Sequence, residues 1–231
     1  MTISNVKTLL ITATILLAAT STNIFANSNF TGVYAGAVVG YSYTPLDFTS
    51  SSIEYLAITK RTYNLSGPAG GLELGYGLVL KNNYYLGLDF LGLLSNVNSA
   101  ETFSATSSSQ RLDFKQKNHY GLDLHLGYEL KDNALLYAIV GYSEASFNAK
   151  ERNVIGSTFD TTNEKNATLS GLDFGVGAKF SISEHFLMDV KYIYTNYNSF
   201  SQIVWTSATS SKNDKYSPKA HLLTLGILYK F

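Results

Sequence analysis

The sequence predicts an all-β fold, an eight-stranded antiparallel transmembrane β-barrel, and three observations predict it. Apolar and polar residues alternate with a period of two in successive segments. The connections between these segments are alternately short and long, as in barrels with turns at one rim and loops at the other. The chain has 17 tyrosines and 13 phenylalanines but only three prolines, a composition that suits β-strands.

Residues 1–26 differ from the rest and are predicted to be a signal peptide. Met1–Lys7 is short and carries one lysine, Thr8–Ala19 is apolar, and Ala26 supplies a small residue at the cleavage position. The apolar run is too short for a membrane-spanning helix, and no later window holds 18 consecutive apolar residues. We therefore expect one domain, residues 27–231, that crosses the membrane with strands.

The first expected strand covers residues 30–43, and the next two form a tight hairpin. From Leu72 to Leu80, leucine and tyrosine alternate with glycine and glutamate. Lys81–Asn83 turns the chain, and a new alternation begins at Leu86.

This unit of strand, short turn and strand occurs twice more. The later strands are expected at residues 120–130, 134–148, 172–182, 186–200 and 220–231. Lys131–Asn133 and Ser183–His185 supply the short turns. The strand at residues 134–148 is the least regular, and its alternation leaves open which side faces inward.

Four connections are long. They lie at about residues 44–67, 98–111, 149–167 and 201–217. Because a hairpin loop usually has two to five residues, four long connections on one side need a reason. Barrels of the outer membrane have this pattern, with short periplasmic turns and long extracellular loops.

Alternation alone does not say which face points inward, but side-chain volume does. Eight strands enclose an interior only wide enough for side chains to fill. One face is crowded with leucine, phenylalanine and tyrosine, whereas the other carries glycines between charged residues. We therefore expect the bulky face to meet lipid and the glycine-rich face to line the lumen, the reverse of a soluble lipocalin-like barrel. Because an open sheet edge is too costly in hydrocarbon, the last strand must pair with the first.

Charged residues of the lumen face are predicted to form an ion-pair network. They are Glu73, Asp89, Asp123, Glu129, Asp173, Lys179, Asp189 and Lys191. Buried charges need partners, so we expect these side chains to plug the barrel. A narrow gated path for ions is the alternative.

The first and last strands carry a resemblance to a known family. The segments "FTGVYAGAVVGYSY" and "GILYKF", with the repeated unit of strands, resemble small outer-membrane β-barrel proteins of Gram-negative bacteria, the OmpA-type and opacity-like porin family. The resemblance implies a place in the cell outer membrane, contact with its lipid, and a structural, surface antigen or adhesin role. It also implies transient recognition by the barrel-assembly machinery through Gly226, Tyr229 and Phe231. The chain departs from full-length OmpA because no periplasmic peptidoglycan-binding domain follows.

Catalysis finds little support in the residues. The formal net charge of zero argues against a nucleic-acid binder, and the absence of cysteine excludes thiolate chemistry. None of the four histidines lies in a His-x-Ser pattern that resembles lipid A deacylase barrels, and Asp123 and Glu129 are about 20 Å apart along a strand. We therefore expect a protein that is not an enzyme, with no catalytic, cofactor-binding or metal-binding residue. A small-solute channel and a lipid-modifying enzyme are the alternatives.

Loops on a rigid scaffold are the usual place for binding, and two of them carry apolar and basic residues. The candidate contacts with a host-cell surface are Tyr55, Lys60 and Arg61 in the first loop and Trp205 in the fourth. Alternatively, the segment Ile203–Trp205 merely extends a strand and packs against the first loop.

Overall fold

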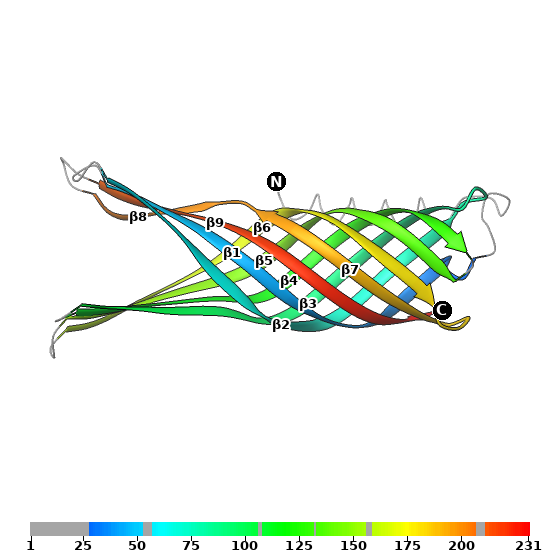
Figure 1. Ribbon diagram of the computed structural model, residues 1–231, viewed down its shortest axis with the longest axis horizontal. Helices are drawn as coiled ribbons and strands as arrows, with labels where there is room; N and C mark the ends of the chain where they lie inside the picture. The colour runs from blue at the N-terminus through cyan, green and yellow to red at the C-terminus, as the bar shows by residue number, and fades with distance from the viewer. Residues whose placement is uncertain (1–27, 53–56, 106–107, 132, 156–158, 207–210) are drawn as a thin grey trace, which may run out of the picture.

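The computed structural model describes residues 28–52, 57–105, 108–131, 133–155, 159–206 and 211–231. These residues form an all-β closed antiparallel barrel (Figure 1). Among them, no helix is long and apolar enough to cross a membrane, a result that has no bearing on crossing by strands. The predicted signal peptide lies outside the described residues.

The described residues contain nine assigned strands that make an eight-stranded barrel. The strands are β1 (Gly32–Ser52), β2 (Ala57–Val79), β3 (Tyr84–Ala105), β4 (Ser108–Lys131), β5 (Ala134–Ile155), β6 (Phe159–Ser181), β7 (Phe186–Tyr197), β8 (Phe200–Thr206) and β9 (Ser211–Lys230). Both β7 and β8 pair with β9, and only Asn198 and Ser199 separate them. They are therefore two parts of one barrel strand, and the predicted architecture is confirmed.

The barrel closes by pairing its first strand with its last. β1 and β9 are antiparallel, with Tyr34 opposite Lys230 and Tyr43 opposite His221. At the rim, the backbone N–H of Phe231 donates to the carbonyl of Val33 at 3.0 Å. No sheet edge is left to face hydrocarbon in the paired region, as the cost of an unsatisfied backbone group requires.

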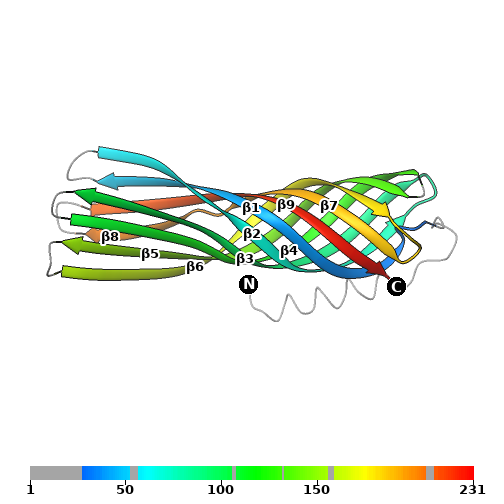
Figure 2. The same ribbon diagram turned by 60° about the horizontal axis from the view of Figure 1, so that its bottom comes forward.

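The connections predicted to be long are long, but most of their backbone is strand. β1 and β2 stay paired from Gly32 opposite Gly77 to Ser52 opposite Ala57. At the end opposite the C-terminus, the strands continue beyond the closed wall as two separate groups, one of β8, β9, β1 and β2 and the other of β3 to β6 (Figures 1 and 2). Strand pairing satisfies the backbone of these segments, and their polar side chains tolerate a strand that is exposed to water.

The two faces of the wall separate as predicted. Outward residues such as Leu72 and Leu94 expose 69% and 70% of their surface, whereas Glu73 and Leu93 beside them expose 1% each. The sequence left open which side of the strand at residues 134–148 faces inward. In β5, Leu135, Tyr137 and Ile139 are buried in the lumen. Leu136, which lies between two of them, and Val140, which follows Ile139, are exposed.

The closing strand presents its bulky residues outward. Alternate side chains are exposed at Leu223, Leu225, Ile227, Tyr229 and Phe231. Rings gather at the rim, where Tyr229 lies 5.1 Å from Phe231, 5.5 Å from Phe186 and 5.7 Å from His185 between ring centroids. An aromatic girdle of this kind is typical of the interface between lipid and water.

One irregularity of β4 changes which of its residues face inward. Between Gln116 and His119 the strand carries one residue more than β5 opposite, so the pairing register shifts. Phe114 and Gln116 point inward before the bulge, and His119 and Gly121 point inward after it. Bulges re-aim side chains in this way.

Candidate functional site

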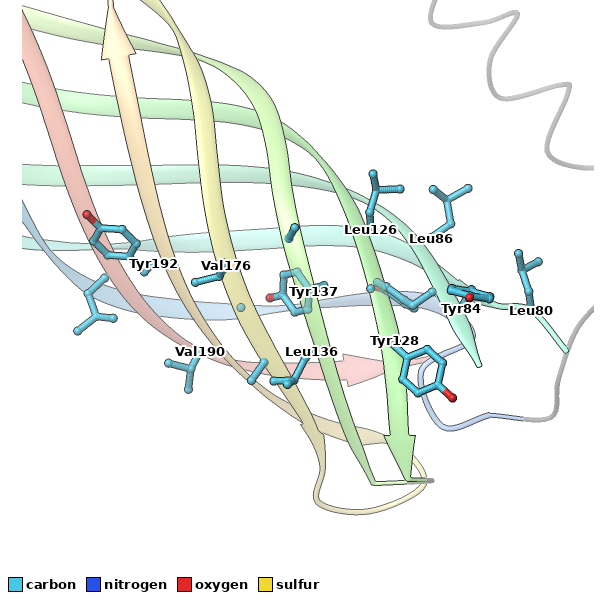
Figure 3. Close-up of a pocket in the computed structure, with 16 residues that line it drawn as sticks. Leu80, Tyr84, Leu86, Leu126, Tyr128, Leu136, Tyr137, Val176, Val190 and Tyr192 are labelled. Atoms are coloured by element: carbon cyan, nitrogen blue, oxygen red, sulfur yellow. The ribbon is translucent and has the colours of Figure 1, made fainter. Parts of the chain in front are cut away.

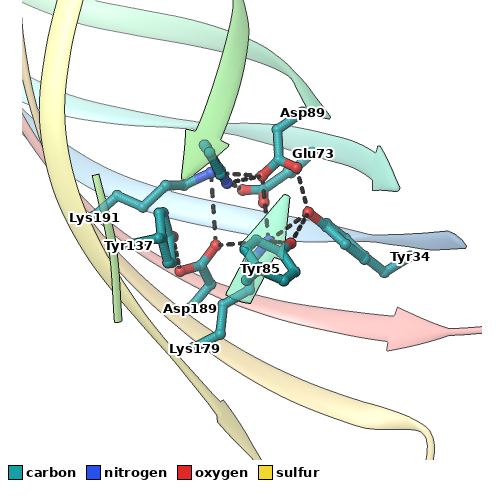
Figure 4. A network of polar contacts seen from close by, with 9 residues as sticks. Tyr34, Glu73, Tyr85, Asp89, Tyr137, Lys179, Asp189 and Lys191 are labelled. Carbon is teal, nitrogen blue, oxygen red and sulfur yellow. Dashed lines mark hydrogen bonds and ion pairs between the residues drawn. The ribbon is translucent and has the colours of Figure 1, made fainter. Parts of the chain in front are cut away.

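Five of the predicted lumen charges meet in one group, here called the lysine network. It contains Glu73 of β2, Asp89 of β3, Lys179 of β6, and Asp189 and Lys191 of β7 (Figure 4). The relative exposure of these side chains is 1% or less. Residues more than a hundred positions apart in sequence are therefore neighbours, because the barrel wall brings four strands around one point.

Both lysines contact more than one carboxylate. Lys191 Nζ lies 2.7 Å from Glu73 Oε2, 3.4 Å from Asp89 Oδ2 and 3.7 Å from Asp189 Oδ2. Lys179 Nζ lies 3.4 Å from Asp89 Oδ2 and 3.7 Å from Asp189 Oδ2. Buried charges are tolerated when they are paired in this way.

The three carboxylates also have the spacing of a metal site. Glu73, Asp89 and Asp189 each offer an oxygen within 4.8 Å of the others. However, the Lys191 ammonium contacts all three groups and so lies where a cation would bind. The lysine network therefore carries its own counter-charge.

Three tyrosines complete the lysine network and were not among the predicted site residues. The hydroxyl of Tyr34 donates to Asp89 Oδ1 and accepts from Lys179 Nζ at 2.5 Å, and the hydroxyl of Tyr137 donates to Asp189 Oδ1. The hydroxyl of Tyr85 lies 3.3 Å from that of Tyr34. Their signal in the sequence is parity, because Tyr85 shares its strand face with Asp89.

Glycines make room for these rings. A Cβ atom built on Gly177 would lie 2.4 Å from Cζ of Tyr137, and one built on Gly77 would lie 2.8 Å from the hydroxyl of Tyr85. A Cβ atom on Gly75 would come within 2.5 Å of the Tyr34 ring. Larger residues would displace the rings at these positions, so glycine and tyrosine alternate around the lumen wall.

Asp123 and Asp173 were predicted to join the same network but lie in a second group. Here we call it the histidine–carboxylate cluster, which contains His119 and Asp123 of β4 and Asp173 of β6. Ser143 and Thr195 donate to Asp173 Oδ1 at 2.8 Å and 2.5 Å, and His119 Nδ1 lies 3.0 Å from the Tyr197 hydroxyl. No salt bridge from Lys179 or Lys191 to this cluster occurs within the described part of the chain.

Glu129 belongs to neither group. It lies near the end of β4, where its Oε1 accepts a hydrogen bond from Ser28 at 2.6 Å. This contact ties the segment before β1 to the barrel rim. It is a local link and not part of the predicted plug.

Apolar side chains fill the part of the lumen between the charges and the hairpins. Towards the hairpins, one buried cluster contains Leu46, Tyr63, Leu65, Val97 and Phe114, and a second contains Ala145, Phe147, Leu169, Tyr197 and Ala220. Tyr63 and Phe114 lie 5.2 Å apart between ring centroids, and Phe147 and Tyr197 lie 5.4 Å apart. The sequence predicted glycines and charged residues in the bore, and the structure adds these apolar layers.

The outer wall has a shallow apolar depression over β3 to β7 (Figure 3). Its lining includes four residues with small side chains, Gly127, Ala138, Gly177 and Ala178, and larger residues such as Tyr128 and Tyr192. Its lining residues include no histidine, serine or carboxylate. Such a surface suits acyl chains and lacks the groups that hydrolysis needs.

The histidines of the described residues lack the contacts of a hydrolase. His125 stacks on Tyr137 with 4.4 Å between ring centroids, and its Nδ1 lies 3.4 Å from Asp89 Oδ2. His221 Nδ1 lies 2.7 Å from the hydroxyl of Tyr192. Within the described ranges, no histidine is hydrogen-bonded to a serine or threonine hydroxyl, the pairing that activates a nucleophile.

The loop candidates are only partly within the described residues. Lys60 and Arg61 lie on β2 and are exposed. Tyr55 lies outside the described residues. Trp205 lies on β8 opposite Lys212 of β9, so its backbone does extend a strand, and its side chain is outside the description.

Comparison with known proteins agrees with this architecture. A 31 kDa outer-membrane immunogenic protein of Brucella melitensis is 25% identical over 214 residues, which cover 88% of this chain and 84% of that protein. A protein of the same description from Brucella suis matches equally.

Among solved structures, the outer membrane protein OprG of Pseudomonas aeruginosa has a TM-score of 0.47 and 12% identity, covering 88% of this chain and 98% of that one. Ail, the attachment invasion locus protein of Yersinia pestis, has a TM-score of 0.42 and 13% identity, covering 87% and 99%.

A family profile covers nearly the whole chain. The family described as outer membrane protein beta-barrel domain matches residues 12–231. Together with the closed barrel and its apolar outer wall, this match places the protein in the outer membrane. The chain belongs to the family of outer membrane protein beta-barrel domains.

Proposed function

We propose that this protein is a non-enzymatic surface antigen or adhesin of the OmpA-type and opacity-like kind, which presents its four hairpins to the exterior. The observation that carries the proposal is the filled lumen. Charged and apolar layers occupy it from Tyr34 near one rim to Phe114 near the hairpins. A barrel without a free bore meets large partners through its hairpins, and the immunogenic name of the Brucella relative is in line with such exposure.

A conductance measurement separates this proposal from the channel alternative. Purified protein in a planar lipid bilayer should show no large steady conductance, because the lysine network and the apolar layers leave no continuous water path. A large general porin, measured in the same bilayer, is the positive control. A steady open pore in the nanosiemens range would overturn the closed-lumen interpretation.

Shortened hairpins test which end of the molecule binds host cells. Ser50 lies opposite Thr59, so residues 51–58 can be replaced by an Asn-Gly turn without changing the register. Ile203 lies opposite Asn213, so residues 204–212 can be replaced in the same way. These deletions remove Tyr55 and Trp205, and we expect attachment of bacteria to host cells to fall.

The matched control shortens a hairpin that carries none of the candidate contacts. Asn153 lies opposite Thr161 in the β5–β6 hairpin, which allows an Asn-Gly turn in place of residues 154–160. This variant should bind host cells like the wild type. Unchanged attachment by the doubly shortened variant, displayed at normal surface levels, would refute the adhesin proposal.

Charge reversal gives a finer test. Lys60→Glu lies on an extracellular hairpin, whereas Lys81→Glu lies in a turn at the other rim, and both side chains are exposed. If a negatively charged host surface is the partner, only Lys60→Glu should lower attachment, more so at low salt. Equal effects of both variants would argue against contact through the first hairpin.

The proposed assembly signal is tested separately. Tyr229 and Phe231 face outward, where the assembly machinery and lipid can reach them, and Gly226 lies opposite Val38 of β1. Phe231→Ser should lower the amount of folded barrel in the membrane, measured on gels without heating. Val39→Ser, also on the outer face, is the control that keeps the C-terminal residues.

Lipid modification is tested by a different readout. Mass spectra of lipid A from cells with and without the protein should be the same. A changed lipid A profile would instead support the enzyme alternative.

A further inference from the structure

Towards the hairpin tips, β2 separates from β3. The pairing of these two strands ends at Ser66 opposite Asn98. β2 nevertheless continues to Ala57, and over this stretch it is paired with β1 alone among the described residues. Figure 1 shows the two groups of strands separating towards their tips. Residues 57–65 of β2 therefore form an edge strand within the described part of the chain.

The backbone of this edge points to the open side at every second residue. Directly after β2, the N–H of Leu80 donates to the carbonyl of Tyr84 at 2.8 Å. In an antiparallel sheet, the N–H and C=O groups of successive residues point to opposite neighbours. The register between β1 and β2 is unbroken, so the even-numbered residues of β2 keep this direction up to the tip. Lys60, Thr62 and Asn64 therefore direct their backbone groups away from β1.

A proline lies where the two strands separate. Pro68 is also even-numbered, and it has no backbone N–H to donate to β3. Pairing with β3 is interrupted there, because it passes directly from Ala69 to Ser66 along β2. The sequence thus supplies a local reason for the ladder to end, and it leaves the next backbone groups of β2 to water.

The two faces of this edge strand differ in character. On the outward face, Lys60 and Thr62 are exposed. On the inward face, Tyr63 and Leu65 are buried in the apolar cluster that also contains Phe114. A strand added beside β2 would continue both faces, because paired residues of neighbouring strands lie on the same side of a sheet. Its inward residues would meet apolar side chains, and its outward residues would meet a lysine.

Charge favours one kind of added strand. Lys60 is followed by Arg61, and both are exposed. The nearby Asp47 of β1 accepts hydrogen bonds from Thr62 and Lys219, so it has its own partners. Pairing with the same edge of a second copy would bring like charges together, which is unfavourable in a sheet. A strand with acidic residues on its outward face would instead be attracted.

We propose that residues 57–65 of β2 bind an extended segment of a partner protein, which adds to the sheet as a further strand. The segment has apolar residues on one face and acidic residues on the other. In this mode of recognition, main-chain hydrogen bonds provide affinity and alternate side chains provide specificity. The inference rests on the proposed surface role, because it names the kind of partner that the first hairpin binds.

A labelled synthetic peptide tests the proposal on the purified barrel. The probe consists of alternating glutamate and valine and is as long as the edge. It is titrated with folded protein in detergent, and binding is followed by fluorescence anisotropy. We expect saturable binding that weakens at high salt. A peptide with lysine in place of glutamate should bind more weakly, and a probe with every backbone nitrogen methylated should not bind.

Thr62→Pro is the sharpest variant. It removes one backbone N–H from the open side and keeps both basic side chains, and proline is tolerated on edge strands. The affinity for the probe should fall roughly 10-fold, because one hydrogen bond is lost and the ring crowds the added strand.

The matched control is Thr168→Pro on the edge of the other group of strands. Pairing of β6 with β7 ends at Gly171, and the carbonyl of Ser170 accepts from the N–H of Asn198 at 2.8 Å. Thr168 is likewise exposed and directs its N–H away from β5. The exposed Glu164 on this edge repels the acidic probe, so the control should bind it like the wild type.

Folding of both variants is checked by their migration on gels without heating. Equal affinity of the wild type and Thr62→Pro would overturn the proposal, as would a wild type that does not bind the probe. A dimer of the wild type in detergent that Thr62→Pro abolishes would place a second copy on the edge and would also overturn it. If Thr62→Pro does not fold, hydrogen exchange in the wild type decides. The probe should slow exchange at Lys60, Thr62 and Asn64, and unchanged rates would refute the proposal.

Host-cell attachment separates this inference from the proposed function. Normal attachment by Thr62→Pro, with attachment lost in the doubly shortened variant, would refute the edge proposal and leave the adhesin proposal standing. Binding of the probe by the wild type, without loss of attachment in either variant, would refute the adhesin proposal and support the edge proposal.

Discussion

The lumen contains two polar groups that solve the problem of buried charge differently. In the lysine network, Lys191 contacts three carboxylates within 3.7 Å, and hydroxyl groups of tyrosines satisfy further oxygens. In the histidine–carboxylate cluster, neither lysine forms a salt bridge, and both oxygens of Asp123 lack a partner among the described residues. One group is neutralised by two lysines, whereas the other holds two carboxylates close together without a lysine salt bridge among the described residues.

The difference shows that side-chain length decides how buried charges are arranged in a narrow lumen. Long side chains from β6 and β7 reach across the lumen and close it, whereas short side chains on β4 and β6 leave space at Gly121. Because buried ion pairs are costly to break, the lysine network is suited to hold the barrel shut. In the histidine–carboxylate cluster, Asp173 is instead held by the hydroxyl groups of Ser143 and Thr195.

The largest expected effect comes from removing a lysine. Lys191→Met leaves Glu73 buried without its partner at 2.7 Å, and such loss typically costs about 3–5 kcal/mol. Urea unfolding in lipid vesicles should show this loss of stability. Adding Glu73→Gln should restore part of it, because the unpaired charge is then gone. A single variant as stable as the wild type would show that the network does not hold the barrel.

A moderate effect is expected where glycine makes room for a tyrosine. Gly177→Ala would press a methyl group against the Tyr137 ring, which is tied to Asp189, and overpacking of this kind costs about 1–3 kcal/mol. Gly70→Ala, where the nearest atom lies at 3.6 Å, is the control and should unfold like the wild type. Equal stability of the two variants would mean that the ring is free to move.

The two polar groups are distinguished most clearly by substitutions whose effects on stability have opposite signs. Asp123→Asn should stabilise the barrel by about 1 kcal/mol, because it removes a like charge beside Asp173. Asp89→Asn should instead destabilise it, because both lysines and Tyr34 lose a charged partner. Urea unfolding of both variants checks the signs. Losses of similar size would erase the distinction between the two groups.

The smallest effect belongs to an ion pair outside the lumen. Lys219 Nζ lies 3.3 Å from Asp47 Oδ2, with side chains that are 43% and 47% exposed. Lys219→Met should therefore cost less than about 1 kcal/mol, and the cost should vanish in high salt. A loss as large as that of Lys191→Met would show that burial does not set the value of these pairs.

Much of the fold could be predicted because residues that face lipid and residues that face the lumen alternate along each strand of a membrane barrel. Leu72 and Glu73 face opposite sides for the same reason that every second residue does, and this holds for most of the wall. The exception is β4, where a bulge before His119 reverses the parity, so that Phe114 and Gln116 face inward although the later inward residues have odd numbers. The long hairpins were taken for loops because their polar residues carry no alternation of hydrophobicity.

The sequence predicted which charged residues line the lumen, but not how they pair. Parity placed eight charged residues in the lumen, but it did not say that Lys191 would reach Glu73, or that Asp123 would stay apart from both lysines. It also left Tyr34 and Tyr85 unassigned, although their rings lie against glycines of the lumen face. These outcomes depend on side-chain length and on the register between strands.

By itself, the sequence determined the architecture, the face that meets lipid and the charged character of the lumen. The physical reason is that hydrocarbon penalises unpaired backbone and exposed charge so strongly that only one arrangement of this alternation is stable. The tertiary structure decided which charges meet, because strand register and tilt bring together residues that no local pattern relates. The pairing of Lys191 with Glu73, and the approach of Asp123 to Asp173, exist only once eight strands have closed around them.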